Sequence, residues 1–287
     1  MKSNYAGKRV WSKMNYETDA EIQRRLLNHY DEALEIYNPD KIVGIFLQGS
    51  QNYGLGTNKS DVDTKCIVLP TFEEVCLNKK LVSYTHVREN DEHIDFKDLR
   101  LMLECFRKQN INFIEILFTS YYRINPDFAE EWQVLIDNRE EIAHYDEWQF
   151  VKSTIGQMHE KYKAAFLPRP SQYEEVEKYG WSTKNLHHLL RFDEFLQRFI
   201  NKEPYVDCLT SKNTEFLLDI KTIGHDMLTL EEAKKLGEEV LEKADTFKEE
   251  YINTHVETMN SDIDSMLDKV AINIFRKSFQ MELGNGT

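Results

Sequence analysis

The sequence of 287 residues contains no apolar run that approaches the roughly 18 residues of a membrane span. Residues 1–13 are basic, but no apolar core or small-residue cleavage site of a secretory signal follows them. We therefore expect neither a membrane protein nor a secreted one.

Cysteine, proline and glycine are also scarce. The four cysteines (Cys66, Cys76, Cys105 and Cys208) form no CxxC pair and have no regular spacing. This pattern argues against a zinc site or structural disulfides and favours reduced thiols in a cytoplasmic protein. The 6 Pro and 11 Gly residues are spread along the chain, so no linker, repeat or low-complexity segment stands out.

Basic residues are fewer than acidic ones: 36 against 50, a formal charge of −14. Such a balance argues against tight, sequence-blind binding to nucleic acid, which depends on neutralising phosphates. An RNA ligand would need a local patch such as Arg24 and Arg25, or residues 1–13, which form either a basic arm or a solvated terminus. Aromatic residues, in contrast, are plentiful (16 Phe, 14 Tyr and 4 Trp), which excludes disorder for most of the chain.

The apolar pattern predicts strands and helices in the first half of the chain and helices in the second. Strands are expected at 42–48, 64–69, 81–87 and 93–96, with helices at 19–37 and 98–109. Further helices are expected at 147–166, 183–200, 230–252 and 262–280. A boundary is predicted at 145–170, with the loop LPRPSQ (167–172), between parts 1–150 and 151–287.

The helix at 230–252 carries two specific expectations. Thr229 and Glu232 fit a capping box at its start, in which each side chain bonds a backbone amide of the other. Its inner face is predicted to consist of Leu230, Ala233, Val240, Leu241, Ala244 and Phe247.

The segment IFLQGSQNYGLGTNKSDVDTKCIVL (45–69) joins two predicted strands through a turn-rich loop. Gly49 and Ser50 follow the first strand, where a close turn exposes amides and a hydroxyl that suit phosphate oxygens. Asp61 and Asp63 lie two residues apart on the second strand, so both carboxylates point to one face. Two such carboxylates repel one another unless a cation lies between them, and oxygen ligands favour Mg²⁺ or Mn²⁺. The combination predicts a site for a metal ion and a nucleotide.

This stretch resembles the signature of the DNA polymerase β-like nucleotidyltransferase superfamily: an apolar strand, Gly-Ser, a loop and Asp-x-Asp. Within that superfamily, GSQNYGLGTNKSDVDTKCIVLP is similar to a bacterial and phage family of predicted, partly RNA-ligase-associated nucleotidyltransferases with a GS-x-x-YGL…SD-x-D core. Residues 98–119 resemble the helix pair of that family, and 178–192 resemble its later GY-x-x-K-x-x-x-H-x-x-R helix. Residues 193–287 lie outside the resemblance.

The resemblance implies an α+β fold, a small mixed sheet flanked by helices, with a mainly helical C-terminal part. It places Asp61 and Asp63 at a metal site for Mg²⁺ or Mn²⁺. A third carboxylate would complete a site for two such ions. It would be Asp95, with Glu92 as the reserve, although the register against the family equally selects His93. Asp95 would lie nearest the incoming nucleophile and help to deprotonate it.

The same resemblance implies the residues that bind the nucleoside triphosphate. Near the loop these are Gly49, Ser50 and Ser60. On the later helix, Lys184, His188 and Arg191 match the family pattern, and their spacing puts them on one helical face. The alternative for these three residues is a solvated Lys/Arg face with a histidine at the edge of the core.

The predicted function is metal-dependent transfer of a nucleoside monophosphate from a nucleoside triphosphate to an acceptor hydroxyl, with release of pyrophosphate. An RNA 3′ end is the first predicted acceptor, and a protein side chain or a small molecule is the second. A different class of function, a non-catalytic nucleotide sensor or partner-binding module on the same fold, is the alternative.

Overall fold

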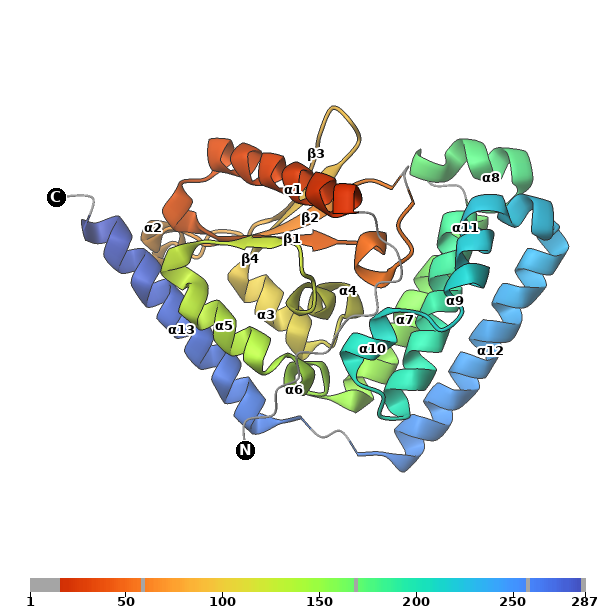
Figure 1. Ribbon diagram of the computed structural model, residues 1–287. Coiled ribbons are helices and arrows are strands. Elements are labelled where there is room, and N and C mark those ends of the chain that lie inside the picture. The colour runs from red at the N-terminus through yellow and green to blue at the C-terminus, as the bar shows by residue number, and fades with distance from the viewer. Residues whose placement is uncertain (1–15, 58–59, 168–169, 257–258, 285–287) are drawn as a thin grey trace.

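A five-stranded sheet lies at the centre of the first half of the chain (Figure 1). The computed structural model describes residues 16–57, 60–167, 170–256 and 259–284, so the basic segment 1–13 and part of the loop 167–172 lie outside the described residues. The strand order is β3-β4-β2-β1-β5. The strands are β1 (Ile42–Gln48), β2 (Asp63–Val68), β3 (Ser83–Val87), β4 (His93–Asp98) and β5 (Tyr122–Ile124). The four predicted strands are confirmed, and β5 is an addition to them.

The sheet is mixed, because β2 runs parallel to β4 and antiparallel to β1. β1 also pairs antiparallel with β5, and β3 with β4. Gln48 at the end of β1 lies opposite Asp63 at the start of β2. The loop between them therefore leaves and re-enters the sheet at the same end of the strands, and this fixes the position of the predicted site.

Helices cover both faces of the sheet, because successive residues of a strand point to opposite sides. α1 (Tyr16–Ile36) packs Ile22, Leu26 and Ala33 on one face, in a cluster that includes Ile45 and Leu47 of β1. This arrangement confirms the helix predicted at 19–37.

The other face of the sheet packs against helices and forms part of the largest buried core. Phe46 of β1 stacks on Trp132, with 4.5 Å between the ring centroids. The helices on this side are α3 (Leu99–Arg107), α4 (Ile111–Ile114), α5 (Ala129–Asp137) and α6 (Arg139–Ala143), and the short α2 (Phe72–Cys76) follows β2. The helix predicted at 98–109 corresponds to α3.

The second half of the chain is helical, which confirms the α+β fold class with a helical C-terminal part. The four helices predicted there correspond to α7 (Glu147–Phe166), α9 (Thr183–Ile200), α12 (Leu230–Thr254) and α13 (Ser261–Gly284). The structure adds α8 (Tyr173–Tyr179), α10 (Tyr205–Leu209) and α11 (Thr214–Met227). The described helices do not include one with the length and apolar character needed to cross a membrane.

The expectations for α12 are confirmed except at its first residue. Thr229 and Glu232 form the capping box, and four residues of the predicted inner face are buried: Ala233, Val240, Leu241 and Ala244. Phe247, also predicted there, is partly buried and packs against the same core. Leu230 is 40% exposed, so its predicted burial is wrong. It lies in the first turn of the helix, next to Gly180 rather than inside the bundle.

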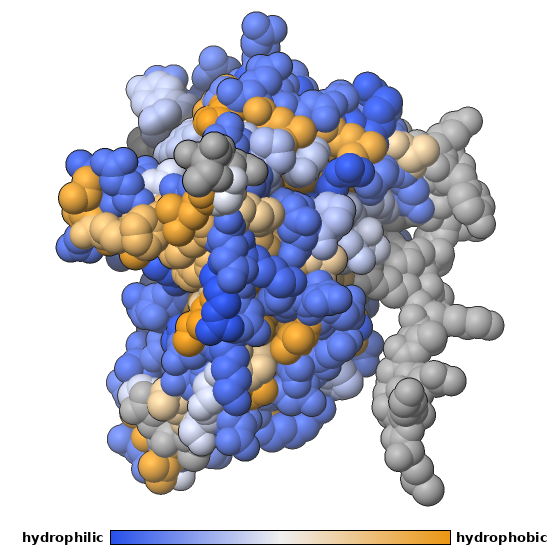
Figure 2. All heavy atoms as spheres, turned by 90° about the vertical axis from the view of Figure 1, so that its left-hand side faces the viewer, coloured by the Kyte–Doolittle hydropathy of each residue, from blue (hydrophilic) through white to orange (hydrophobic). Residues whose placement is uncertain are grey.

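The last helix, α13, crosses back to the first half of the chain and packs against α5 and α3 (Figure 1). Its Glu282 lies 2.6 Å from the Lys41 ammonium, and its Asp264 lies 2.6 Å from Nε of Arg107. Figure 2 shows the side of the molecule on which α13 ends, and its surface there is largely hydrophilic.

The division into parts 1–150 and 151–287 stays a prediction, while the buried core continues across residue 150.

Candidate functional site

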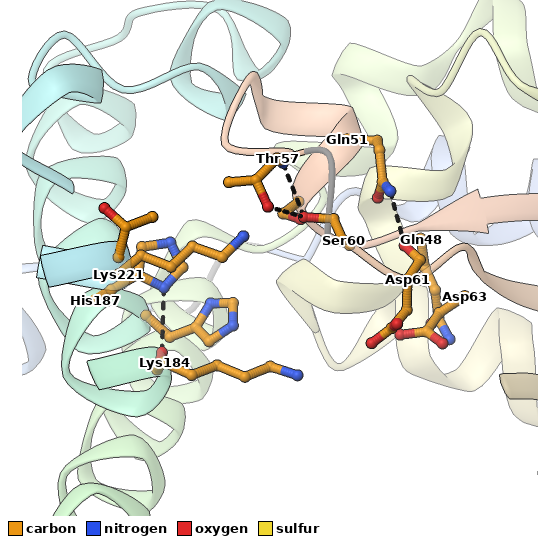
Figure 3. A pocket seen from close by; sticks show the side chains of 13 residues that line it. Gln48, Gln51, Thr57, Ser60, Asp61, Asp63, Lys184, His187 and Lys221 are labelled. Carbon is orange, nitrogen blue, oxygen red and sulfur yellow. Dashed lines mark hydrogen bonds between the residues drawn. The ribbon is translucent and has the colours of Figure 1, made fainter. Parts of the chain in front are cut away.

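A cavity of about 760 Å³ lies where β1 ends and β2 begins (Figure 3). One wall comes from the sheet and its loop, and we call it the strand wall. The strand wall consists of Gln48, Gly49, Ser50, Gln51, Thr57, Ser60, Asp61 and Asp63. The opposite wall, the helical wall, consists of Lys184, His187 and His188 of α9 with Lys221 and Thr222 of α11.

The turn after β1 depends on Gly49, whose φ of +94° and ψ of −162° are taken up readily by glycine alone. It starts a short 3₁₀ turn (Ser50–Tyr53), which directs Ser50 into the strand wall. The Gly49 amide donates to the buried Glu115 carboxylate at 3.3 Å, so this amide is already occupied. The pKa of the Glu115 carboxyl is raised, because the effect of burial exceeds the opposing effects of Arg191 and of the hydrogen bonds from Tyr53 and Gly49.

The two carboxylates of the Asp-x-Asp motif point into the same space in Figure 3. Asp63 accepts a hydrogen bond from the His93 amide at 3.0 Å, and Nδ1 of His93 lies 3.5 Å from the same oxygen. Val62 between the two aspartates is fully buried and turns away from the cavity. Burial raises the pKa of Asp63, and the nearby Asp61 carboxylate raises it further, against the effects of His93 and Lys184.

Ser60 closes the loop that leads to this motif. Its hydroxyl accepts the Thr57 amide at 2.9 Å, and its amide donates to the Thr57 carbonyl at 2.9 Å. Gln51 anchors the same loop by donating to the Asp61 carbonyl at 2.7 Å. These bonds fix the backbone that presents Asp61 to the cavity.

The helical wall brings positive charge to the cavity. The side chains of Lys184 and Lys221 reach from α9 and α11 toward the strand wall (Figure 3). Beside them, Nδ1 of His187 bonds the Lys184 carbonyl at 3.1 Å. Burial lowers the pKa of His187 to about 3 and that of His188 well below its ordinary value, so both imidazoles are neutral at pH 7.

The structure does not bring Asp95 into the cavity lining. Its carboxylate accepts bonds from Gln48 (2.9 Å) and the Thr85 hydroxyl, and it lies 3.7 Å from the Lys65 ammonium. Burial alone would raise the pKa of Asp95, but Lys65 and the bonds from Thr85 and Gln48 outweigh it and lower that pKa. Asp95 lies on the same face of the sheet as Asp63, but it pairs with Lys65, two residues further along β2. Gln48, which pairs with Asp63, lines the cavity and binds Asp95.

The reserve candidate, Glu92, is buried beneath the Asp-x-Asp motif and does not line the cavity. Its carboxylate is 1% exposed and accepts bonds from Arg25, His29 and Arg88. Within the ranges that the structure describes, no three Asp, Glu, His or Cys side chains form a metal-binding group. Asp61 and Asp63 are thus the carboxylates that line the cavity.

The three matched residues of α9 take different positions. Lys184 and His188 line the cavity, whereas Arg191 is 2% exposed and lies beneath it, with its guanidinium carbon 3.9 Å from the centre of the Tyr53 ring. Arg191 thus contacts the turn that carries Ser50 instead of the cavity itself. The predicted loop residues Gly49, Ser50 and Ser60 all belong to the strand wall.

The sequence interpretation did not include His187, Lys221 and Thr222. His187 adjoins a residue that was predicted, but nothing in its own position marks it. Lys221 lies on α11, for which no helix was predicted. Leu217, Ile220 and Gly224, spaced by three and four residues, form the buried face of this helix and are the signal that could have located it.

No protein-family model matches the chain, and no curated protein matches its sequence. A solved structure, that of a nucleotidyltransferase-like protein from Exiguobacterium sibiricum, is similar over 80% of this chain and 75% of its own. The identity is 10% and the TM-score is 0.31.

Proposed function

We propose that the chain is a nucleotidyltransferase of the DNA polymerase β-like type, with the motif of the RNA-ligase-associated family. The observation that carries this proposal is the cavity itself, in which Asp61 and Asp63 on one wall face Lys184 and Lys221 on the other. A volume of about 760 Å³ is within the range of sites that enclose small ligands. A chain of phosphates fits between these walls, because a metal ion can join it to the carboxylates and the lysines can neutralise its remaining charge.

The carboxylate pair fits one Mg²⁺ or Mn²⁺ ion. Both ions prefer oxygen ligands, and Mg²⁺ is commonly bound by one or two carboxylates together with substrate phosphates. Asp61 and Asp63 would hold the ion, and their mutual repulsion would then be relieved. When bound, the ion supplies charge neutralisation and polarisation of the phosphate that is transferred.

The remaining residues bind and orient the nucleotide. The hydroxyls of Ser50 and Ser60 and the tight turn at Gly49 form the strand side of the phosphate site, and Lys184 stabilises the charge of the leaving pyrophosphate. His188 presents a neutral imidazole, and Arg191 supports the turn from beneath. In the reaction the acceptor oxygen forms a bond to the α-phosphorus, and the bond from this phosphorus to the oxygen that bridges to the β-phosphate breaks. Pyrophosphate leaves with the bridging oxygen, and the proton of the acceptor hydroxyl passes to solvent water.

Asp95 has a restricted place in this scheme. Asp95 would have to separate from the Lys65 ammonium before its carboxylate could bind a metal ion as a third ligand or accept the proton of the acceptor hydroxyl. In the arrangement described, it holds the Gln48 amide that lines the cavity.

The two arginines expected to contact an RNA acceptor are paired with carboxylates. An RNA 3′ end is the first candidate from the sequence, but Arg24 is paired with Glu21, and Arg25 with Glu92. These arginines therefore have less charge to offer to RNA phosphates than the sequence alone indicates. A protein side chain or a small molecule remains the second candidate.

A non-catalytic nucleotide-binding module is the competing function, and one observation favours it. The Lys65–Asp95 pair holds the predicted third carboxylate outside the cavity. A module of this kind would bind a nucleotide without turning it over.

Calorimetry with ATP, GTP, CTP and UTP in the presence of Mg²⁺ tests nucleotide binding directly. We expect at least one of them to bind the wild type. The double substitution Asp61→Ala with Asp63→Ala should weaken that binding at least about 10-fold, because it removes charge-assisted contacts to the ion.

A matched control separates this effect from a change in net charge. Glu249 and Glu250 are exposed on α12, and replacing both by alanine removes the same charge without altering the cavity. The assignment fails if no nucleotide binds the wild type, or if the aspartate variant binds as well as the control.

Labelled nucleotide then identifies the acceptor class. The wild type is incubated with each labelled triphosphate and with RNA, cell lysate or small hydroxyl compounds. Label on RNA, on protein or on a small molecule identifies the acceptor, whereas binding without any transfer supports the non-catalytic module.

A further inference from the structure

The helical wall contains a lysine that comes from outside the segment of family resemblance. Lys221 is half-buried on α11, and its ammonium donates a hydrogen bond to the Leu55 carbonyl at 2.8 Å. Leu55 belongs to the loop between Gly49 and Asp61. Lys221 therefore connects the helical wall to the loop of the strand wall, and its side chain points toward that loop in Figure 3.

The position of Lys221 is fixed by packing of the backbone. The helix α11 is kinked at Ile223, where φ is −128° and ψ is 17°, directly after the two residues that line the cavity. A Cβ on Gly224 would lie 3.0 Å from Trp181 and 3.1 Å from Thr183. This close approach to the start of α9 sets Lys221 beside Lys184.

The two lysines leave positive charge on this wall. Neither forms an ion pair with a carboxylate in the described parts of the chain. Burial and the nearby Lys184 lower the pKa of Lys221, while Asp61 across the cavity raises it. An anion between the lysines would relieve their repulsion, which is the arrangement that a phosphate site requires.

The neighbouring imidazole indicates a second feature of the ligand. The Lys184 carbonyl can only accept a hydrogen bond, so Nδ1 of His187 carries the proton and Nε2 is left as an acceptor. Nε2 is buried and has no hydrogen-bond partner among the residues described. A ligand with both phosphates and hydroxyl or amino donors, as a nucleotide has, matches the two lysines and this imidazole.

We propose that Lys221 is a phosphate-binding residue that acts with Lys184 to hold the triphosphate of the nucleotide against the strand wall. The inference depends on the proposed nucleotide site and deepens it, since it assigns the selectivity for triphosphate over monophosphate to the helical wall. One N–H of the ammonium bonds Leu55, and the other two are available to phosphate oxygens.

The test compares a triphosphate with its monophosphate. Calorimetry in Mg²⁺ uses the triphosphate that the wild type binds best among ATP, GTP, CTP and UTP, together with the matching monophosphate. We expect Lys221→Met to weaken triphosphate binding roughly 10- to 100-fold, the usual effect of a lost charge-assisted hydrogen bond. Monophosphate binding should change by less than about 3-fold, because the proposed contacts are to the outer phosphates.

Two further variants make the result specific. Lys221→Arg keeps the charge and should restore most of the triphosphate affinity. Lys235→Met makes the same substitution on α12, where the lysine side chain is 76% exposed, and should leave both affinities unchanged.

Two outcomes overturn the inference while the proposed function stands. Unchanged triphosphate binding in Lys221→Met would remove the contact altogether. Equal loss for triphosphate and monophosphate, with a lower melting temperature, would make Lys221 a tether to Leu55 and nothing more. If the wild type binds no nucleotide, the proposed function itself fails and the inference fails with it.

Discussion

Gly49 has a backbone conformation that costs other residues about 1–3 kcal/mol. A Cβ at this position would meet no atom within 4 Å, so space is not the reason for the glycine. The reason is the positive φ, which turns the chain out of β1 and into the cavity wall. The pattern Gly-Ser after an apolar strand predicted this turn because glycine is the residue that fits it at least cost.

Replacing Gly49 by alanine should therefore lower the free energy of unfolding by about 1–3 kcal/mol through backbone strain. Gly156 offers a matched control, since it is exposed within α7 and a Cβ there also meets no atom within 4 Å. Gly156→Ala should raise the stability by roughly 0.5–1 kcal/mol, because alanine favours the helix. Urea unfolding of both variants measures the two effects, and equal signs would contradict the role of φ.

At the level of single residues, the sequence predicts the cavity lining better than it predicts the partners of each group. Gly49, Ser50, Ser60, Asp61, Asp63, Lys184 and His188 all line one cavity. The position of Asp95 depends on the parallel register of β2 and β4, which sets it opposite Lys65. That pairing is non-local, so the alternation of polar and apolar residues gives the face of Asp95 but not its neighbour.

At the level of elements, α1 stabilises the strand that carries the carboxylates. His29 of α1 bonds the Thr64 hydroxyl at 2.8 Å through Nδ1 and the Glu92 carboxylate at 3.0 Å through Nε2. The other oxygen of Glu92 accepts the Val62 amide at 3.2 Å. These bonds hold residues on both sides of Asp63, so α1 positions the motif from the opposite face of the sheet.

This network predicts a pH dependence of stability. Burial, with a contribution from Arg88, lowers the pKa of His29 from 6.5 to about 4, so the folded chain keeps this imidazole neutral where the unfolded chain protonates it. Its contribution to stability is present above pH 6.5 and is lost as the pH falls toward 4. The slope is at most about 1.4 kcal/mol per pH unit for one proton.

Urea midpoints of the wild type and of His29→Gln at pH 7, 6 and 5 measure this contribution. The variant should lose less stability than the wild type between pH 7 and 5, because glutamine does not titrate. His187 and the carboxylates are common to both proteins and cancel in the difference. Parallel curves would contradict the lowered pKa, because they would show that His29 binds protons equally in the folded and the unfolded chain.

The helices that the sequence predicted in the second half have long, uninterrupted periodic patterns, whereas the elements that it did not predict are short or, in α11, interrupted. The long helices α7, α9, α12 and α13 each expose one face and bury the other. β5 has three residues and exists because it pairs with β1, which local sequence does not reveal. The helix α11 is interrupted at Ile223, so its pattern is broken where the cavity residues lie.

At the level of the whole molecule, one buried core joins the sheet to the helical part. It contains Phe46 of β1, Met158 of α7, Leu189 of α9, Ala244 of α12 and Ile274 of α13. α13 strengthens this connection by packing on α3 and α5. The chain should therefore unfold as one cooperative unit despite its size.

Guanidinium unfolding followed by tryptophan fluorescence and by far-UV circular dichroism tests this prediction. The two transitions should coincide, and Ile274→Ala should shift both by the same amount. The substitution removes a fully buried side chain and should cost about 2–5 kcal/mol. Two separate transitions, or a shift in only one signal, would show that the parts unfold independently.

The two walls of the cavity lie far apart in the chain, one at residues 48–63 and the other at 184–222. A ligand that fills the space between them therefore acts as a removable cross-link within a single polypeptide. Ligand at 100 times its dissociation constant would add about 2.7 kcal/mol to the stability of the folded state. The supply of that ligand would then set how often the chain opens to proteases, and so the lifetime of the protein as well as its activity.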